Sequence, residues 1–171
     1  MIRTFRRQMC DGSSSRLFAA GLFAILLVSR STAQNTVSEP VGFVRAIVSS
    51  NSEVLLSLPF DAFDPDIGAL FSNQLTGATN ALTADVVRGW DAVSQNYTNA
   101  YKADGTGNPD RDGRWFSDFT TWSTSDLSLF PGDGFWIGNR QNQTQTVFLC
   151  GRVLLSETGT VALLPGLNLF G

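Results

Sequence analysis

Short apolar runs separated by polar turn signals make up the chain after residue 40. "VGFVRAIV" (Val41–Val48) and the run Glu53–Leu58 are rich in β-branched and aromatic residues, and "SSNS" separates them. Such runs predict two strands, and their short separation predicts that they pair as a hairpin. The same criteria predict further strands at Val86–Trp90, within 94–103 and 114–122, at Gly134–Gly138 and at Thr146–Leu149. The last of these is expected to continue either as one bent strand or as a pair of strands, with the break at Gly151.

These patterns predict an all-β fold. No run of ten or more residues in the predicted domain repeats its apolar positions every 3.6 residues, as an amphipathic helix would. Short strands with turn signals every ~8–12 residues are typical of a sandwich or a barrel. We therefore predict one sandwich or barrel-like domain over residues 41–171, with at most one or two short helical turns. The apolar end "NLFG" predicts a strand that continues, so the chain is expected to be truncated at Gly171.

The segment "FDAFDPDIG" combines three carboxylates with a helix-start pattern. Asp64 is expected to cap a short helix, with Pro65 at the first helical position and Asp66 favoured by the helix dipole. The alternative is chemical, because two carboxylates at a fixed separation are the catalytic pair of glycosidases. Asp61 would then join Asp64 or Asp66, but the spacing alone does not establish such a pair. The helix cap is the preferred interpretation.

The segment "LFPGDGFWIGNR" (Leu129–Arg140) predicts a tight turn followed by a strand. Pro131 presets φ at the second position of a type II turn, and Gly132 supplies the positive φ that the third position needs. The strand "GFWI" is apolar at successive positions, so both of its faces are expected to be buried and Trp136 to lie in the core. The alternative places Trp136 on the surface as a platform on which a sugar ring stacks.

The first 33 residues have the order of a secretory signal peptide. A basic start precedes the twelve-residue apolar run Leu17–Val28, and the small residues Ser31–Ala33 follow. A membrane-spanning helix needs roughly 20 apolar residues, so this run predicts a signal-peptide helix with cleavage after residue 33, and an uncleaved anchor is the alternative. Residues 34–40 are a polar lead-in. The mature protein is expected to be exported to the periplasm, the cell surface or the extracellular space, with no membrane span.

The charge balance narrows the class of partner. The full chain holds 12 Lys and Arg and 15 Asp and Glu. Residues 1–33 contain five Arg and one Asp of these, so the remaining 138 residues hold 7 basic and 14 acidic side chains and a net charge of −7. Nucleic acids and anionic membranes both attract clustered cations, so neither is an expected partner. An unidentified protein or a glycan is the expected class of partner.

Several catalytic chemistries lack their residues in this chain. There is no His, which excludes Ser-His-Asp and Cys-His nucleophiles and the usual zinc sites. There is also no Gly-rich phosphate-binding loop. We therefore predict that the protein is not an enzyme and needs no organic cofactor. Cys150, the one cysteine of the mature chain, is expected to be a small buried hydrophobe, with a reactive thiol or a disulfide between molecules as the alternatives.

The loop "DGTGNPDRDGRW" carries a candidate calcium site. Asn108, Asp110 and Asp112 are followed by Gly113, which is the order of oxygen ligands and sharp turn that begins a calcium-binding loop. Asp104 is a further candidate ligand. The twelfth position of the pattern is aromatic where that type of loop has a bidentate Glu, so the ligand set is incomplete. An ordinary solvated turn is the alternative.

The order of four segments carries a resemblance to a known family. "VGFVRAIVSSNSEVLLSLPF", "NQLTG", "LFPGDGFWIGNR" and "PGLNLFG" resemble a paralogous family of exported bacterial proteins of Verrucomicrobium-type genomes. The resemblance covers most of Val41–Gly171. It implies a signal peptide, a β-rich body and a Pro-Gly-x-Gly-Phe segment, and it implies no catalytic residues.

Two function classes follow from the sequence. The first is an exported, non-catalytic structural or surface-interaction domain. The alternative is a carbohydrate-binding module, because all four Trp lie between Trp90 and Trp136, with Trp90, Trp115 and Trp122 as candidate ligand-binding residues. Exposure of the indole rings separates the two classes. Rings on one open face would favour a carbohydrate, and rings in the core would remove the support for it.

Overall fold

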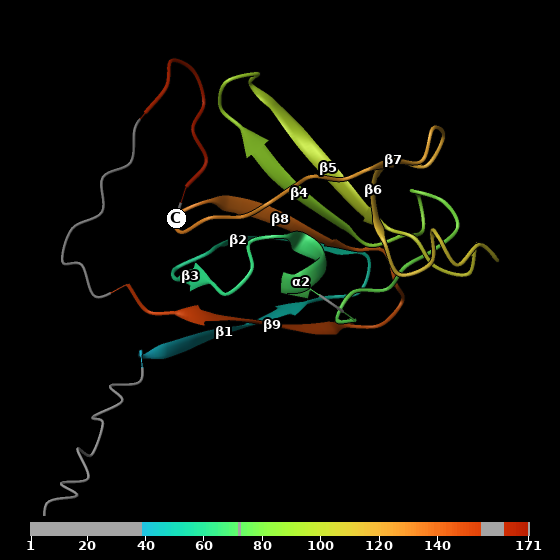
Figure 1. Ribbon diagram of the computed structural model, residues 1–171, viewed down its shortest axis with the longest axis horizontal. Helices are drawn as coiled ribbons and strands as arrows, with labels where there is room; N and C mark the ends of the chain where they lie inside the picture. The colour runs from blue at the N-terminus through green and yellow to red at the C-terminus, as the bar shows by residue number, and fades with distance from the viewer. Residues whose placement is uncertain (1–38, 72, 155–162, 171) are drawn as a thin grey trace, which may run out of the picture. The chain divides into compact units, whose positions relative to one another are not determined.

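The computed structural model describes residues 39–71, 73–154 and 163–170, which belong to the compact unit Glu39–Gly171. Two antiparallel sheets form this unit (Figure 1). The three-stranded sheet has the order β1 (Val41–Val48), β9 (Gln145–Arg152) and β3 (Asp61–Ala62). The six-stranded sheet has the order β2 (Ser52–Ser57), β8 (Gly134–Asn139), β4 (Val86–Asp91), β5 (Asn96–Lys102), β6 (Trp115–Asp118) and β7 (Ser123–Thr124).

The all-β prediction is confirmed. The described residues form one helix, α2 (Ile67–Phe71), and they contain no helix that is long and apolar enough to cross a membrane. β1 has its predicted bounds, β4 and β8 each extend one residue further than predicted, and β2 is shifted by one residue toward the N-terminus. The signal peptide and the first residues of the polar lead-in lie outside the described part of the chain.

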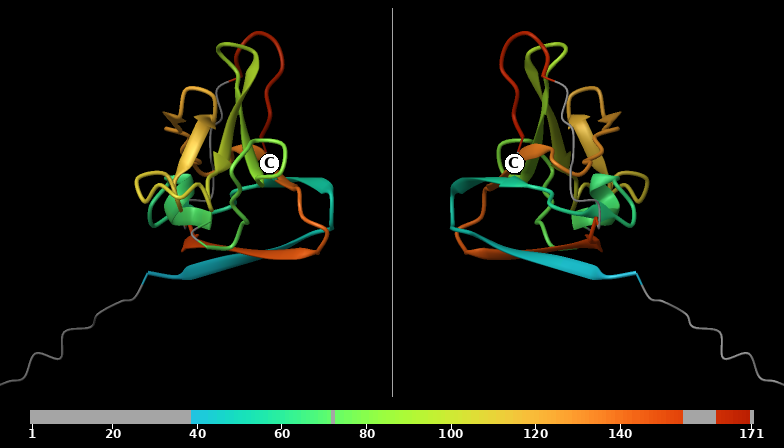
Figure 2. Two further views of the ribbon diagram at one scale, coloured as in Figure 1. Left: turned by 90° about the vertical axis from the view of Figure 1, so that its right-hand side faces the viewer. Right: turned by 90° about the vertical axis from the view of Figure 1, so that its left-hand side faces the viewer.

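The core lies between the two sheets, which appear as separate layers in the side views (Figure 2). Alternate residues of each strand enter it, because successive side chains of a strand point to opposite faces. Phe71 of α2 contacts the rings of Trp115 and Phe135 at centroid distances of 6.2 and 6.1 Å, so the helix contributes to this core. The large side chains that are fully buried come from both sheets, α2 and the connecting segments: Phe71, Phe135, Leu58, Ile67, Leu129, Ile137 and Leu149.

β1 and β2 follow each other in the chain but do not pair. β1 pairs with β9 over its whole length and β2 pairs with β8, so the predicted hairpin is wrong. The chain passes from one sheet to the other through a corner at 49–51, where Asn51 has a φ of 50°. Asn139 is fully buried beside this corner, and its amide donates to the carbonyls of Val48 and Ser49, each at 3.1 Å. The hydrophobic pattern of the sequence shows which face of a strand is buried, but it does not show this polar contact. The corner between the two sheets was therefore not predicted.

β9 runs without a break from Gln145 to Arg152, so the predicted interruption at Gly151 is wrong. A Cβ at Gly151 would collide with the carbonyl of Asp61 and the ring of Phe60. The missing side chain therefore lets β3 approach and pair with β9 at this point.

Cys150 lies on the outer face of the same strand. Val147 and Leu149 point into the core, so the alternation along β9 turns Phe148 and Cys150 outward. Cys150 is exposed, and the prediction that its thiol is buried is wrong. Apolar neighbours in the sequence gave that prediction, but they belong to a strand with only one buried face.

The short helix is capped by a different residue from the predicted one. The Asp66 carboxylate accepts the N–H groups of Gly68 and Ala69 at 2.8 and 3.3 Å, which is the role of an N-cap. Asp64 instead accepts the N–H of Asp66 at 3.0 Å, in the turn before the helix. The prediction that Asp64 is the cap is therefore wrong by two residues, because each Asp of the segment has the side chain for that role.

The turn before β8 has the predicted type II geometry. Gly132 has a φ of 88°, and the Asp133 N–H donates to the Phe130 carbonyl at 3.0 Å. The Asp133 carboxylate also accepts the N–H of Phe130 at 2.8 Å. Pro131 and Gly132 thus set the point at which β8 begins.

The Asp85 carboxylate is fully buried and connects three segments that are distant in sequence. It accepts the backbone N–H groups of Thr76 at 2.6 Å and Arg140 at 2.8 Å, and the side-chain amide of Gln145 at 2.8 Å. A buried charge is tolerated only where donors surround it. Asp85 therefore joins the connection before β4, the end of β8 and the start of β9.

We expect Asp85→Ala to lower the free energy of unfolding by about 2–4 kcal/mol, because several buried donors would lose their acceptor. Urea denaturation measures this change. Asp126→Ala is the matched control, since Asp126 is exposed, and it should leave the denaturation midpoint unchanged. Equal midpoints for the two variants would contradict a structural role of Asp85.

Candidate functional site

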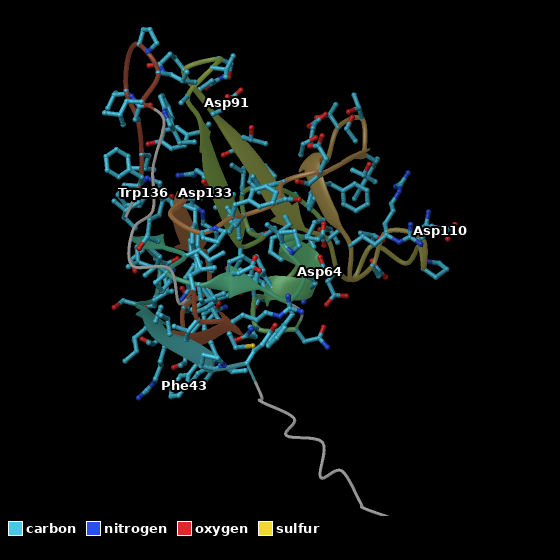
Figure 3. All side chains as sticks on the ribbon, turned by 60° about the vertical axis from the view of Figure 1, so that its left-hand side comes forward. Phe43, Asp64, Asp91, Asp110, Asp133 and Trp136 are labelled. Carbon is cyan, nitrogen blue, oxygen red and sulfur yellow. The ribbon has the colours of Figure 1, made fainter. Side chains whose placement is uncertain are left out.

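Trp136 lies on the outer face of the six-stranded sheet, so the prediction that it is buried is wrong. Phe135 and Ile137 are fully buried in the core, whereas Trp136 between them is only partly buried. A strand that buries two residues on one face must turn the residue between them to the other. Figure 3 shows Trp136 near Asp133 at the start of β8, away from Phe43 on the three-stranded sheet.

Cross-strand pairing places polar and apolar side chains in a row with Trp136. Leu55 of β2 and Arg88 of β4 lie opposite Trp136 on its two sides. Asn99 of β5 lies opposite Arg88 and extends the row to a fourth strand. Directly opposite residues in an antiparallel pair share a face, so these four side chains all belong to the outer face.

A groove of about 510 Å³ lies along this row. Aromatic, charged and amide side chains from four strands line it: Glu53, Arg88, Asn96, Tyr97, Asn99 and Trp136. Gly134 and Gly138 flank Trp136 on its own strand and face. Leu169 occupies the space over Gly134, and Val86 and Glu53 occupy the space over Gly138.

Two ion pairs hold the charged residues of the groove in place. The Glu53 carboxylate accepts Arg88 Nη1 at 2.7 Å with one oxygen and Arg140 Nη2 at 2.8 Å with the other. The three side chains are between 26% and 32% exposed, so water reaches the cluster. Two guanidinium groups on one carboxylate leave the cluster with one net positive charge.

Trp90 and the C-terminal segment stand beside the groove. The Trp90 ring contacts the Tyr97 ring edge to face, with a centroid distance of 4.8 Å. Its indole N–H donates to the Leu167 carbonyl at 2.9 Å, and Gln95 exchanges hydrogen bonds with Leu167 at 2.7 and 3.0 Å. Trp90 is thus fixed by other groups and supports Tyr97.

The two other candidate ligand-binding Trp residues do not reach the groove. Trp115 is only 7% exposed and packs in the core. Trp122 is stacked on Phe119 at 5.0 Å, and the Arg111 guanidinium lies over its ring at 4.1 Å, so its ring is already in contact with other groups. Of the four Trp residues, Trp136 is the one whose side chain lines the groove.

Sequence reasoning missed Arg88, Asn99 and Tyr97 as site residues. They come from β4 and β5 and meet Trp136 only through strand pairing, which the sequence does not reveal. One signal was present in the sequence. Gly134 and Gly138 are each two residues from Trp136 and share its face, and Gly within a strand marks a place where other groups approach closely.

The candidate calcium ligands lie in one loop, and the side chains of Asp104, Asn108 and Asp112 accept hydrogen bonds from that loop. Asp112 accepts the hydroxyl of Thr106 at 2.6 Å and its N–H at 2.8 Å, and these bonds hold the pKa of Asp112 below its usual value. The Asn108 side chain accepts the Asp110 N–H at 2.9 Å, and that of Asp104 accepts the N–H of the next residue at 2.8 Å. The described residues contain no group of three or more His, Cys, Asp or Glu placed to hold a metal. Calcium binding here stays a prediction.

No family model, curated protein or solved structure matches this chain.

Calcium binding predicts a higher melting temperature in excess calcium than in a chelator. Weak extracellular sites have dissociation constants of about 10⁻⁴–10⁻³ M, and a hundredfold excess over the dissociation constant would stabilise the fold by about 2.7 kcal/mol. The shift should vanish in the double variant Asp110→Ala/Asp112→Ala. Identical melting curves of the parent chain in both buffers would leave the loop as a solvated turn.

Proposed function

We propose that this protein is an exported, non-catalytic binding domain and that the groove beside Trp136 takes a carbohydrate. The observation that carries the proposal is an indole ring on an open sheet face, next to convergent polar side chains. The volume of about 510 Å³ lies within the ~300–1,000 Å³ range of small-molecule sites.

The lining chemistry matches the two kinds of surface that a sugar presents. The C–H groups on one face of a pyranose pack on the negatively polarised face of an aromatic ring, which Trp136 supplies. Tyr97, 42% exposed, adds a second aromatic contact and a phenolic hydroxyl. Amides both donate and accept hydrogen bonds. The Asn96 oxygen already accepts the Tyr97 N–H and the Asn99 oxygen is buried, so the NH₂ groups of these two residues are the donors for sugar hydroxyl groups.

The charge pattern favours a neutral sugar over an anionic one. The two charged residues of the lining, Glu53 and Arg88, pair with each other, so the lining carries no net charge; Arg140, which makes the cluster net positive, is not part of the lining. The remaining Glu53 lone pairs and guanidinium N–H groups can still bind hydroxyl groups at the groove rim. A neutral oligosaccharide therefore fits this site better than a uronic acid or a nucleotide.

A binding role fits the groove better than hydrolysis does. Most glycosidases use two carboxylates on either side of the scissile bond. The lining contains one carboxylate, Glu53, and two arginine residues hold it. We therefore assign the groove to recognition. The resemblance to the exported Verrucomicrobium-type paralogues is part of the same proposal, because it implies export and no catalytic residues.

The test is affinity electrophoresis of the full chain in gels that contain neutral polysaccharides. We expect retardation by at least one polysaccharide, and we expect Trp136→Ala to weaken it tenfold or more, which corresponds to about 1.4 kcal/mol. Phe130→Ala is the matched control, because Phe130 is an exposed aromatic residue of the turn before β8 that does not line the groove.

Each outcome of this experiment bears on the proposal. Binding that survives Trp136→Ala, or that Phe130→Ala reduces equally, would assign the interaction to another surface. Chemical denaturation of both variants shows whether the fold persists. Absence of retardation by every neutral polysaccharide in the panel would overturn the assignment of ligand class.

A further inference from the structure

The outer face of the three-stranded sheet carries a group of exposed apolar side chains. Alternation along β1 and β9 turns these residues away from the core. Phe43 is 74% exposed and Phe148 is 50% exposed. The full set on these two strands is Val41, Phe43, Ile47, Phe148 and Cys150. Apolar side chains that gather on a surface in this way indicate an interaction site.

β1 is also an edge strand with little of the usual protection, since Arg45 is its one charged residue. The sheet order is β1-β9-β3, and no described strand pairs with the other edge of β1. Its eight residues contain no Pro and no Lys, and its register with β9 is continuous, without a bulge. Natural proteins block exposed edges with such features because an open edge pairs readily with another strand.

The neighbouring strand shows how this fold covers an edge. Beyond the short β3, the Gln74 side chain accepts the Phe148 N–H at 2.6 Å and donates to the Phe148 carbonyl at 2.9 Å. An amide side chain thus replaces a missing strand on β9. Among the described residues, the side-chain bond that reaches β1 is the one from the Asn139 amide to the carbonyl of Val48, at the end of the strand.

The sequence of β1 is complementary to itself in one antiparallel register. A two-fold axis through Val44 places Phe43 opposite Arg45 of the second copy, and Val41 opposite Ile47 of the second copy. Each pair occurs twice. The Arg–Phe pairs are cation–π contacts and the Val–Ile pairs are aliphatic cross-strand contacts, and both types stabilise a sheet.

The competing register is unfavourable. In an antiparallel pair of two β1 strands, directly opposite residues lie on the same face of the sheet. Each outward residue of one copy must therefore lie opposite an outward residue of the other copy. Two such registers keep seven of the eight strand residues paired, one centred on Val44 and the other on Arg45. The second places Arg45 opposite Arg45 of the second copy, and like charges that are directly opposite destabilise a strand pair.

We infer that β1 pairs with β1 of a second copy of this chain, in the register centred on Val44. The two three-stranded sheets then form one continuous six-stranded sheet across the two-fold axis. Cys150 lies on β9, opposite Phe43 and one strand away from the new interface. The dimer is therefore non-covalent, and reductant does not dissociate it.

The experiment is sedimentation equilibrium of the full chain at several concentrations, with and without reductant. We expect a dimer in both buffers and in Cys150→Ser. Phe43→Arg places two like-charged pairs at the interface, so it should weaken dimerisation at least tenfold. Phe43→Arg/Arg45→Phe exchanges the partners of each pair and should restore the dimer, which a general loss of folding or of apolar surface would not allow.

Cys150→Arg is the matched control. It adds the same charge to the same outer face, but on β9 and opposite Phe43 rather than opposite Arg45, so it should leave the dimer intact. A monomeric parent chain at every concentration would overturn the proposal. So would a dimer that reductant dissociates, a dimer that Cys150→Arg disrupts, or a failure of the exchanged double variant to restore dimerisation while circular dichroism shows it folded.

Discussion

The pleat of β8 is the constraint on which both the core and the groove depend. Successive side chains of a strand point to opposite faces, so burying Phe135 and Ile137 forces Trp136 outward. A slip of one residue would exchange the two faces and expose both core residues. Pairing with β2 on one side and β4 on the other holds the register that prevents this.

Buried polar groups at the end of β8 fix that register. Asn139, the last residue of the strand, holds the corner between β1 and β2 through the carbonyl of Val48. The next residue, Arg140, donates its N–H to the buried Asp85 carboxylate at 2.8 Å, and its side chain pairs with Glu53 at the groove. Two adjacent residues thus connect the sheet junction, the buried polar network and the proposed binding surface. The position of the groove depends on contacts outside it.

The sequence predicted elements that rest on local physical chemistry and missed those that rest on pairing. The apolar run of β1 and the turn at Pro131–Gly132 carry their own signals, and both predictions are confirmed. The partner of β1 could not be predicted, because alternation specifies a buried face and not a neighbouring strand. The continuous apolar run around Trp136 concealed its exposure, and Arg88 becomes a site residue only through the pairing of β4 with β8.

The central claim is that Trp136 is open to solvent on the outer face of β8 while the core lies behind it. Oxidative footprinting with mass spectrometry of the folded protein measures this directly, by comparing the rates at which individual indole rings are oxidised. Trp115, only 7% exposed, is the internal reference for a buried ring. The account predicts that Trp136 is oxidised several-fold faster than Trp115. Equal protection of the two rings would contradict it.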